Sequence, residues 1–221
     1  MSAHRNTSVR YPGGFDSFWG ILAFCCSYAI MYLWPGDVFQ RATEQTFLEI
    51  RGAPTSVAEV LVMQDAVMPA WKEVGWIFYN AHFVQVSVPL EANQWTMTNL
   101  LRSAGGDLLI LFLVPPLTLM AAGYLVTRGK THVHDLRFDL GDSLGWRYWL
   151  NGGLMTAFGY LPLTFAVGIL VHHNRLGPDL LFVWILAGMV YPFVFGGLGS
   201  YLNYVGIRRR GELETVAVSR W

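Results

Sequence analysis

The sequence predicts an all-α integral membrane protein, with four transmembrane helices and a partly helical external insertion between the first and the second. Composition is the first reason: 53% of the 221 residues are apolar and 14% are charged, whereas roughly a quarter are charged in soluble globular domains. Four segments also reach the roughly 17 to 25 mainly apolar residues that a helix needs to cross a bilayer. Because these runs lack the alternation of a transmembrane barrel, we expect helices in a single membrane domain over residues 1–221.

The four predicted spans follow one another along the chain, with one long interval after the first. They are Phe15–Leu33, Gly105–Val126, Leu150–Val171 and Leu180–Val205. Each of the last three contains proline, at Pro115, Pro116, Pro162 and Pro192. Proline removes a backbone donor, so we expect kinks in these helices, which are common in membrane proteins.

The placement of basic residues predicts the orientation in a cell membrane. With a cytoplasmic N-terminus, ten Lys and Arg residues fall inside and five outside, as the positive-inside rule requires. Arg208, Arg209 and Arg210 then follow the last span on the inner side, so both termini are expected in the cytoplasm. Basic and acidic residues balance at 15 each, so the sequence predicts no nucleic-acid partner.

The external insertion, Pro35–Ser103, carries local signals of structure. Ser56 and Glu59 form a capping-box pattern that predicts a helix over Val57–Met68. A second helical pattern begins at Ala70 and continues through WKEVGWIFYNAHF, whereas the alternation of Phe83–Val88 fits a strand.

The aromatic-rich stretch Gly75–Leu90 within this insertion leaves three interpretations open. It is a fifth span, an interfacial or re-entrant element, or part of a small external subdomain. Four polar residues in 16 positions disfavour a span, because an unpaired polar group in hydrocarbon costs kilocalories. We favour an interfacial or re-entrant element packed on the spans.

His82, Asn80 and Asp107 are the candidate functional residues. Histidine binds metals and moves protons near neutral pH, and His82, His172 and His173 all fall on the external side. Their spacing matches no compact metal motif, so we predict no metal and expect His82 to form hydrogen bonds within the external element. Asp107 lies near the external start of the second span, where Arg102 is its expected partner.

A second set of residues predicts helix packing. Thr156 and Tyr160 on the third span, and Gly188, Gly196 and Ser200 on the fourth, recur at multiples of four residues. Small and hydroxyl side chains at that spacing allow close approach and hydrogen bonding between membrane helices. The alternative is a substrate groove lined by Tyr160, Tyr191 and Tyr201.

No catalytic, phosphate-binding or dinucleotide-binding motif occurs, so we expect neither an enzyme nor a cofactor. The sequence predicts a noncatalytic scaffold or subunit of a membrane assembly, with the lipid bilayer and a second copy or another membrane protein as partners. The alternative is a small-solute transporter or permease with a cavity between proline-kinked helices. Asp107 and the tyrosines of the last two spans would then line the path.

The segment GWIFYNAHFV at 75–84, with Asn80-Ala81-His82 at its core, resembles a segment of uncharacterised polytopic membrane proteins of haloarchaea. The excess of arginine over lysine and the four-span layout are similar too. The resemblance implies an archaeal cell membrane, and it assigns no catalytic residue.

Overall fold

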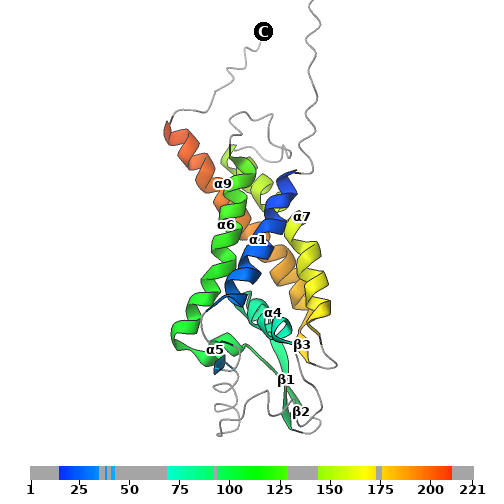
Figure 1. Cartoon of the computed structure of the whole chain (residues 1–221). Helices are drawn as coiled ribbons and strands as arrows, with labels where there is room; N and C mark the ends of the chain where they lie inside the picture. The colour runs from blue at the N-terminus through cyan, green and yellow to red at the C-terminus, as the bar shows by residue number, and fades with distance from the viewer. Residues whose placement is uncertain are drawn as a thin grey trace, which may run out of the picture.

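Helices dominate the structure, a computed structural model that describes residues 15–34, 38, 41–42, 69–91, 94–128, 144–172 and 176–210 (Figure 1). The helix expected over Val57–Met68 lies outside these residues, as does His173. A helical bundle makes up most of the described structure, and a small cap of two helices and a sheet covers one of its ends.

The bundle is built from α1 (Phe15–Tyr32), α6 (Val114–Thr127), α7 (Leu144–Leu170) and α9 (Tyr191–Arg210). A 3₁₀ stretch, η1 (Gly106–Leu113), leads into α6, and α8 (Leu180–Phe182) with the π-helical η3 (Val183–Val190) leads into α9. Three continuous helical stretches are long and apolar enough to cross a membrane, namely Gly106–Thr127, Leu144–Leu170 and Leu180–Arg210. They correspond to three of the four predicted spans.

The first predicted span forms α1, which packs against α6 and α7. With 18 residues, α1 is shorter than α7 and α9 but longer than α6, the α-helical part of the second span. It begins with Asp16 in its first turn. Its role as a fourth span therefore stays a prediction. Elsewhere the predicted ends shift: α7 begins at Leu144 instead of Leu150, and α9 continues to Arg210 instead of Val205.

The prolines of the second predicted span do not lie in the middle of a regular helix. Pro115 and Pro116 occupy the first turn of α6, where the 3₁₀ stretch changes into an α-helix. Proline favours the first turn of an α-helix because its fixed φ suits that position. Pro162, in contrast, lies inside α7 as expected.

The cap contains α4 (Ala70–Ala81), α5 (Leu100–Ala104) and a three-stranded antiparallel sheet. Its strands are β1 (Val86–Glu91), β2 (Gln94–Thr98) and β3 (Gly177–Pro178), in the order β2-β1-β3. The all-α class therefore holds for the bulk of the described chain and is wrong for the cap. Val86 pairs with Thr98 on one side and with Pro178 on the other, and the second pairing joins the insertion to the segment between α7 and α8.

Glycines bring the bundle helices into backbone contact. A Cβ on Gly123 of α6 would overlap the backbone of Gly196 in α9, and a Cβ on Gly199 would overlap the carbonyl of Met120. Ser200 lies in the same interface and donates a hydrogen bond to the Tyr148 carbonyl oxygen at 2.5 Å. The other predicted packing positions also face neighbouring helices: Thr156 lies against Gly196, and Gly188 against Leu161.

We predict that Gly199→Ala destabilises the bundle by about 1 to 3 kcal/mol, because the added methyl group meets a backbone atom that has no rotamer to change. Gly206→Ala in the same helix is the matched control, since the nearest atom there is the mobile end of Arg210 at 3.5 Å. Thermal unfolding in detergent measures both. Equal melting temperatures for the two variants would contradict the close approach of α9 and α6.

Candidate functional site

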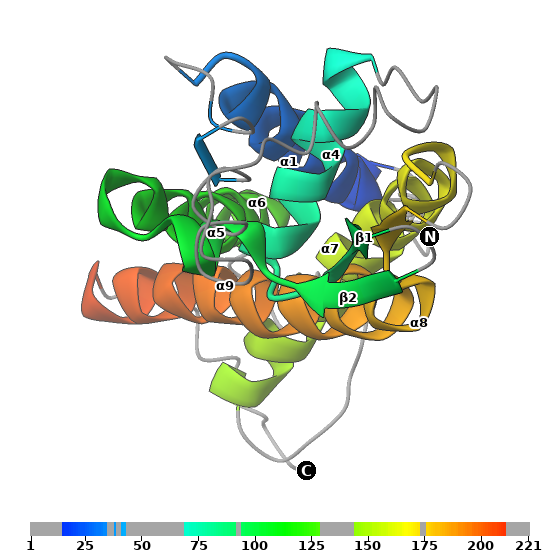
Figure 2. The same ribbon diagram turned by 90° about the horizontal axis from the view of Figure 1, so that it is seen from below.

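The candidate site is the C-terminal half of α4, which lies across the end of the bundle next to the sheet (Figure 2). Pro69 precedes the helix in an extended conformation, as a proline at a helix start commonly does. Every residue from Gly75 to Ala81 is buried. A helix that is apolar or aromatic on all sides must be enclosed by protein or lipid. α4 is thus an internal element of the cap, with bundle and sheet around it.

Three side chains of α4 bind backbone oxygens at the end of α7. The Trp76 indole nitrogen donates to the Val171 oxygen at 3.2 Å, and Lys72 Nζ donates to the His172 oxygen at 3.2 Å. The Tyr79 hydroxyl donates to the oxygen of Thr164, farther back inside α7, at 2.5 Å. Carbonyls at a helix C-terminus lack helical donors and favour a nearby cation. α4 therefore binds the oxygens of Val171 and His172 just beyond α7 and adds a third bond to the helix itself.

The C-terminus of α4 closes in a Schellman-type turn. The Phe83 N–H bonds to the Asn80 oxygen at 2.9 Å, and the Val84 N–H bonds to the Tyr79 oxygen at 3.0 Å. The turn requires a left-handed residue, usually glycine, yet Phe83 occupies it with φ of 60°. Its ring stacks on Phe112 with centroids 4.7 Å apart, which offsets part of the backbone strain.

Asn80 joins α4 to α5 and to Val84, which lies just before β1. Its amide nitrogen donates to the Val84 oxygen at 2.8 Å, and its side-chain oxygen accepts the Leu100 N–H at 2.9 Å. The Asn99 amide donates to the backbone oxygen of Asn80 at 2.8 Å. Asn80 is fully buried, and both ends of its amide are engaged. The predicted site residue thus acts as a junction within the cap.

His82 joins the cap to the bundle. Its Nδ1 lies 2.8 Å from the Phe78 oxygen, and its Nε2 lies 2.8 Å from the hydroxyl of Tyr160 in α7. A carbonyl only accepts, so Nδ1 carries the proton and Nε2 accepts from the Tyr160 hydroxyl. Burial lowers the His82 pKa to about 4, and the ring is therefore neutral at pH 7.

Aromatic rings enclose the imidazole. Phe78 lies with its ring centroid 4.6 Å from that of His82, and Tyr191 at the start of α9 lies 5.0 Å away. Beyond Tyr160, the Ser27 hydroxyl of α1 is a hydrogen-bonding neighbour, and it meets Thr118 of α6 at 2.5 Å. A line of polar groups therefore runs from the cap through α7 and α1 to α6.

Asp107 takes no part in this arrangement. It lies in the first turn of η1, is exposed, and forms an ion pair with Arg41 at 3.3 Å. The expected partner, Arg102, was wrong, because the guanidinium within reach of the Asp107 carboxylate is that of Arg41, which lies 66 positions earlier in the chain.

The described residues give no support for a metal site formed by His82, His172 and His173. Within the ranges that the structure describes, no group of three His, Cys, Asp or Glu side chains is placed to hold a metal ion. Both nitrogens of His82 are engaged in hydrogen bonds, and His172 Nδ1 lies 3.4 Å from the Gly168 oxygen of its own helix. His173 is outside the described residues.

Several residues of the site were not predicted from the sequence. Trp76, Tyr79 and Lys72 act through backbone oxygens roughly 90 positions later in the chain. Backbone acceptors carry no sequence signature. The density of aromatic residues over 75–83 is the only signal that marks this helix as buried.

We predict that stability depends on His82 between pH 6.5 and 4. Because the folded pKa lies below the ordinary 6.5, the unfolded chain binds the proton first as pH falls. The contribution is complete above pH 6.5 and is lost toward pH 4, by an amount on the order of 3 kcal/mol. Melting temperatures of the wild type should fall across this window relative to those of His82→Phe.

His172→Gln is the control, since it removes a histidine from the same end of the bundle that is only partly buried. It should retain the pH dependence of the wild type. A His82→Phe curve parallel to that of the wild type would show that His82 does not carry the effect.

The family of the chain was sought by comparison with known proteins. No curated protein and no solved structure matches the chain. A family model, described as a family of unknown function (DUF7978), matches residues 2–206, which include the bundle and the whole cap. The match agrees with the expected likeness to an uncharacterised family. The chain therefore belongs to DUF7978, a family whose function is not known.

Proposed function

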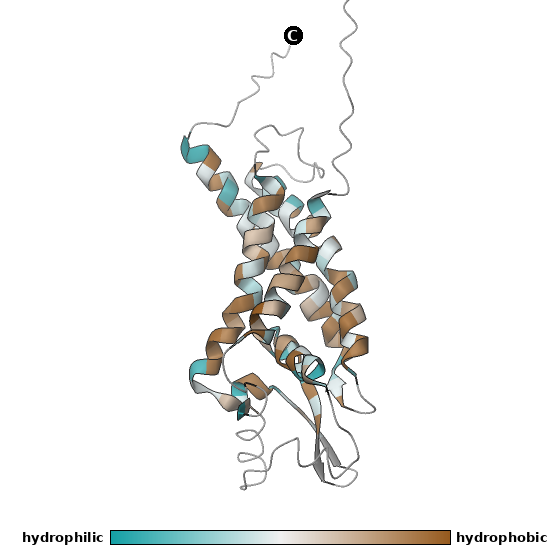
Figure 3. Cartoon of the chain, viewed as in Figure 1, coloured by the Kyte–Doolittle hydropathy of each residue, from teal (hydrophilic) through white to brown (hydrophobic). Residues whose placement is uncertain are grey.

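We propose that this protein is a noncatalytic, multi-pass component of the cell membrane, acting as a scaffold or subunit of a membrane assembly. In this proposal α1 joins the three long apolar helices as a fourth span, and both termini are cytoplasmic. The bundle supports it by exposing large apolar side chains, and Figure 3, which colours the ribbon by hydropathy, shows hydrophobic residues in brown along its helices. Examples are Leu117, Phe158, Leu181, Leu202 and, on α1, Ile21 and Ile30. A bilayer is the solvent that suits such a surface.

The single observation that carries the scaffold function is the complete use of the polar groups in the candidate site. Both nitrogens of His82 and both ends of the Asn80 amide are hydrogen-bonded within the chain. A catalytic or transport site needs polar groups left available to a substrate. Here they hold the cap on the bundle. The archaeal origin implied by the resemblance stays a prediction.

The cap also exposes large apolar side chains. Phe83 is 57% exposed and Met97 in β2 is 42% exposed. Exposed large apolar groups beside a sheet are typical of contact surfaces. We propose that this face meets the partner subunit or a second copy.

We predict that a photo-crosslinking amino acid at position 83 or 97 captures a protein partner in native membranes. The same residue at Ala166, an exposed position on α7, is the lipid-facing control and should give little capture. Immunoblotting and mass spectrometry identify the products. A strict monomer with no captured protein at either cap position would argue against the scaffold function.

A permease is the second candidate, and the π-helical stretch favours it. Val183–Val190 forms eight residues of π-helix directly before Tyr191, whose ring faces His82. Such stretches are strained and occur frequently at functional sites. A path would then run beside η3, where helix geometry is least regular.

Cysteine accessibility tests this candidate in a background with Cys25 and Cys26 replaced. The permease hypothesis expects single cysteines at positions 107, 160 and 191 to react with a water-soluble maleimide in membranes. The scaffold hypothesis expects reaction at 107 only, because Tyr160 is fully buried and Tyr191 is nearly so. Sealed positions 160 and 191 would eliminate the permease.

A further inference from the structure

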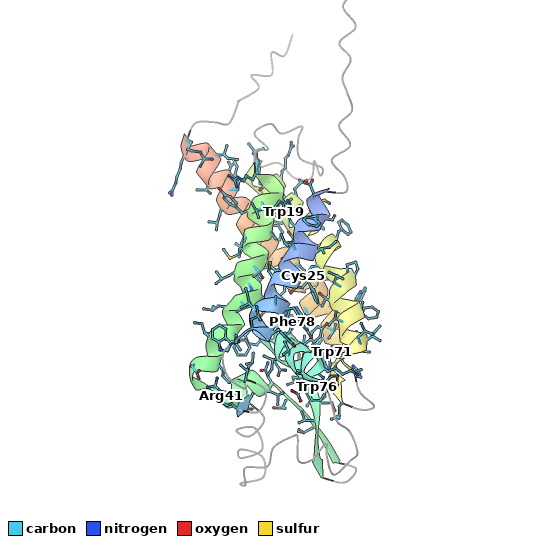
Figure 4. The ribbon with its side chains drawn as sticks, viewed as in Figure 1. Trp19, Cys25, Arg41, Trp71, Trp76 and Phe78 are labelled. Carbon is cyan, nitrogen blue, oxygen red and sulfur yellow. The ribbon has the colours of Figure 1, made fainter. Side chains whose placement is uncertain are left out.

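A groove runs along the outer face of the bundle between α1 and α6. Its volume is about 200 Å³, and its walls are almost wholly apolar. The lining residues are Trp19, Leu22, Ala23 and Cys26 of α1 and Thr118, Ala121, Ala122 and Leu125 of α6. The two small alanines of α6 leave the space that larger side chains would fill. Figure 4 places Trp19 near the beginning of α1 and Cys25, which precedes the lining residue Cys26, farther along the helix.

Few polar atoms belong to the lining side chains: the Thr118 hydroxyl, the Trp19 indole nitrogen and the weakly polar Cys26 thiol. The Thr118 hydroxyl is already bonded, since it meets Ser27 at 2.5 Å and lies 3.0 Å from the Pro115 oxygen of its own helix. Carbon therefore makes up most of the walls, which suits an apolar ligand better than a polar one. Its volume exceeds the roughly 150 Å³ of a cavity that admits a benzene ring. A segment of hydrocarbon chain suits this chemistry and size.

A cation stands in line with the groove. Thr118, Ala121, Leu125 and Arg128 are three or four residues apart, and so they lie along one face of α6. Arg128 is the C-cap of that helix and is exposed, one turn beyond the last lining residue. The Arg128 guanidinium forms no ion pair with the described part of the chain.

The same end of the molecule is rich in basic residues. The last turn of α9 carries Arg208, Arg209 and Arg210, all exposed, and Figure 1 shows this turn at the end of the bundle where α6 also ends. Among the described residues at this end, Asp16 in the first turn of α1 is acidic, and it is buried and already engaged in an interaction. The exposed charges of the described residues there therefore favour an anion.

We propose that the α1–α6 groove binds one hydrocarbon chain of an anionic phospholipid, whose headgroup pairs with Arg128. The inference rests on the proposed membrane location, because the groove must open to lipid. The chain lies against Leu22, Ala121 and Leu125, and the phosphate lies at the membrane surface beside the guanidinium. Charge-assisted pairing of arginine with phosphate supplies the headgroup preference.

The test uses full-length protein, delipidated in detergent and titrated with dioleoyl phosphatidylglycerol or dioleoyl phosphatidylcholine under native mass spectrometry. Ala121→Phe fills the groove and should lower binding of both lipids by roughly tenfold, about 1.4 kcal/mol. Leu22→Trp fills the groove from α1 and should lower the binding of both lipids in the same way. It replaces Ala121→Phe in the test if that variant folds poorly. Ala166→Phe, the same change at an exposed position on α7, is the control.

Arg128→Gln separates headgroup from chain. It should leave phosphatidylcholine binding unchanged and reduce the preference for phosphatidylglycerol by roughly fivefold to tenfold. Arg102→Gln, an exposed arginine in the cap, is its control. The inference is overturned if the filling variants bind lipid as Ala166→Phe does, if Arg128→Gln keeps the full preference, or if filling the groove abolishes a dimer instead of lipid binding.

Failure of this inference differs from failure of the proposed function. Wild-type protein extracted from membranes by alkaline carbonate would contradict the membrane location itself. Protein that resists carbonate but binds lipid equally in all variants would contradict only the groove.

Discussion

The hydrogen bond between His82 and Tyr160 is the contact on which the arrangement of cap and bundle depends. It joins a residue at the end of α4 to one in the middle of α7, across 78 positions of sequence, at 2.8 Å and without solvent. A buried donor or acceptor that loses its partner costs about 1 to 3 kcal/mol. Both side chains are fully buried, so loss of this bond would leave the His82 ring nitrogen without a partner, and the bond thereby helps to fix where α4 lies on the bundle.

The other cap contacts follow from that placement. Once His82 is held, Tyr79 and Trp76 lie about one and two turns back along α4, where they reach the oxygens of Thr164 within α7 and Val171 just beyond it. Asn80, in the same helix, then bonds the start of α5 and Val84 just before β1. Burial raises the pKa of Tyr79 well above its ordinary value, which keeps its hydroxyl protonated as a donor. One short helix therefore uses all of its faces to connect separate parts of the chain.

The three long apolar helices were predictable because the length and apolar composition that a bilayer would require are displayed directly by the sequence. The helix beginning at Ala70 was also predicted correctly, from its pattern and the preceding proline. The sheet was only partly predictable. The alternation at Phe83–Val88 indicated a strand, but β3 is two residues that contain a proline and have no strand pattern of their own. Its pairing with Val86 depends on tertiary placement.

In the candidate site, too, the sequence indicated which residues are important but not which partners they bind. His82 and Asn80 attracted attention as polar residues in an apolar stretch, and both are central to the structure. Their roles follow from partners such as Tyr160 and Leu100, which local sequence does not reveal. The hydroxyl spacing on the third span did indicate a helix interface that includes Tyr160, but it did not indicate that the neighbour would be the insertion.

A site whose polar groups are all paired to one another has a mechanical consequence. It resists separation of cap and bundle, and it has no bonding capacity left for a ligand. Interaction with other molecules must then occur where the described surface still offers unsatisfied chemistry. The exposed apolar residues Phe83 and Met97 lie on the cap, and Arg128 lies beside an apolar groove toward the opposite end of the bundle. In the scaffold that we propose, a rigid cap would transmit a partner's position to the bundle without changing the hydrogen bonds of the candidate site. The contrast between that fully bonded site and the exposed groups at the two ends is the physical argument for the proposal.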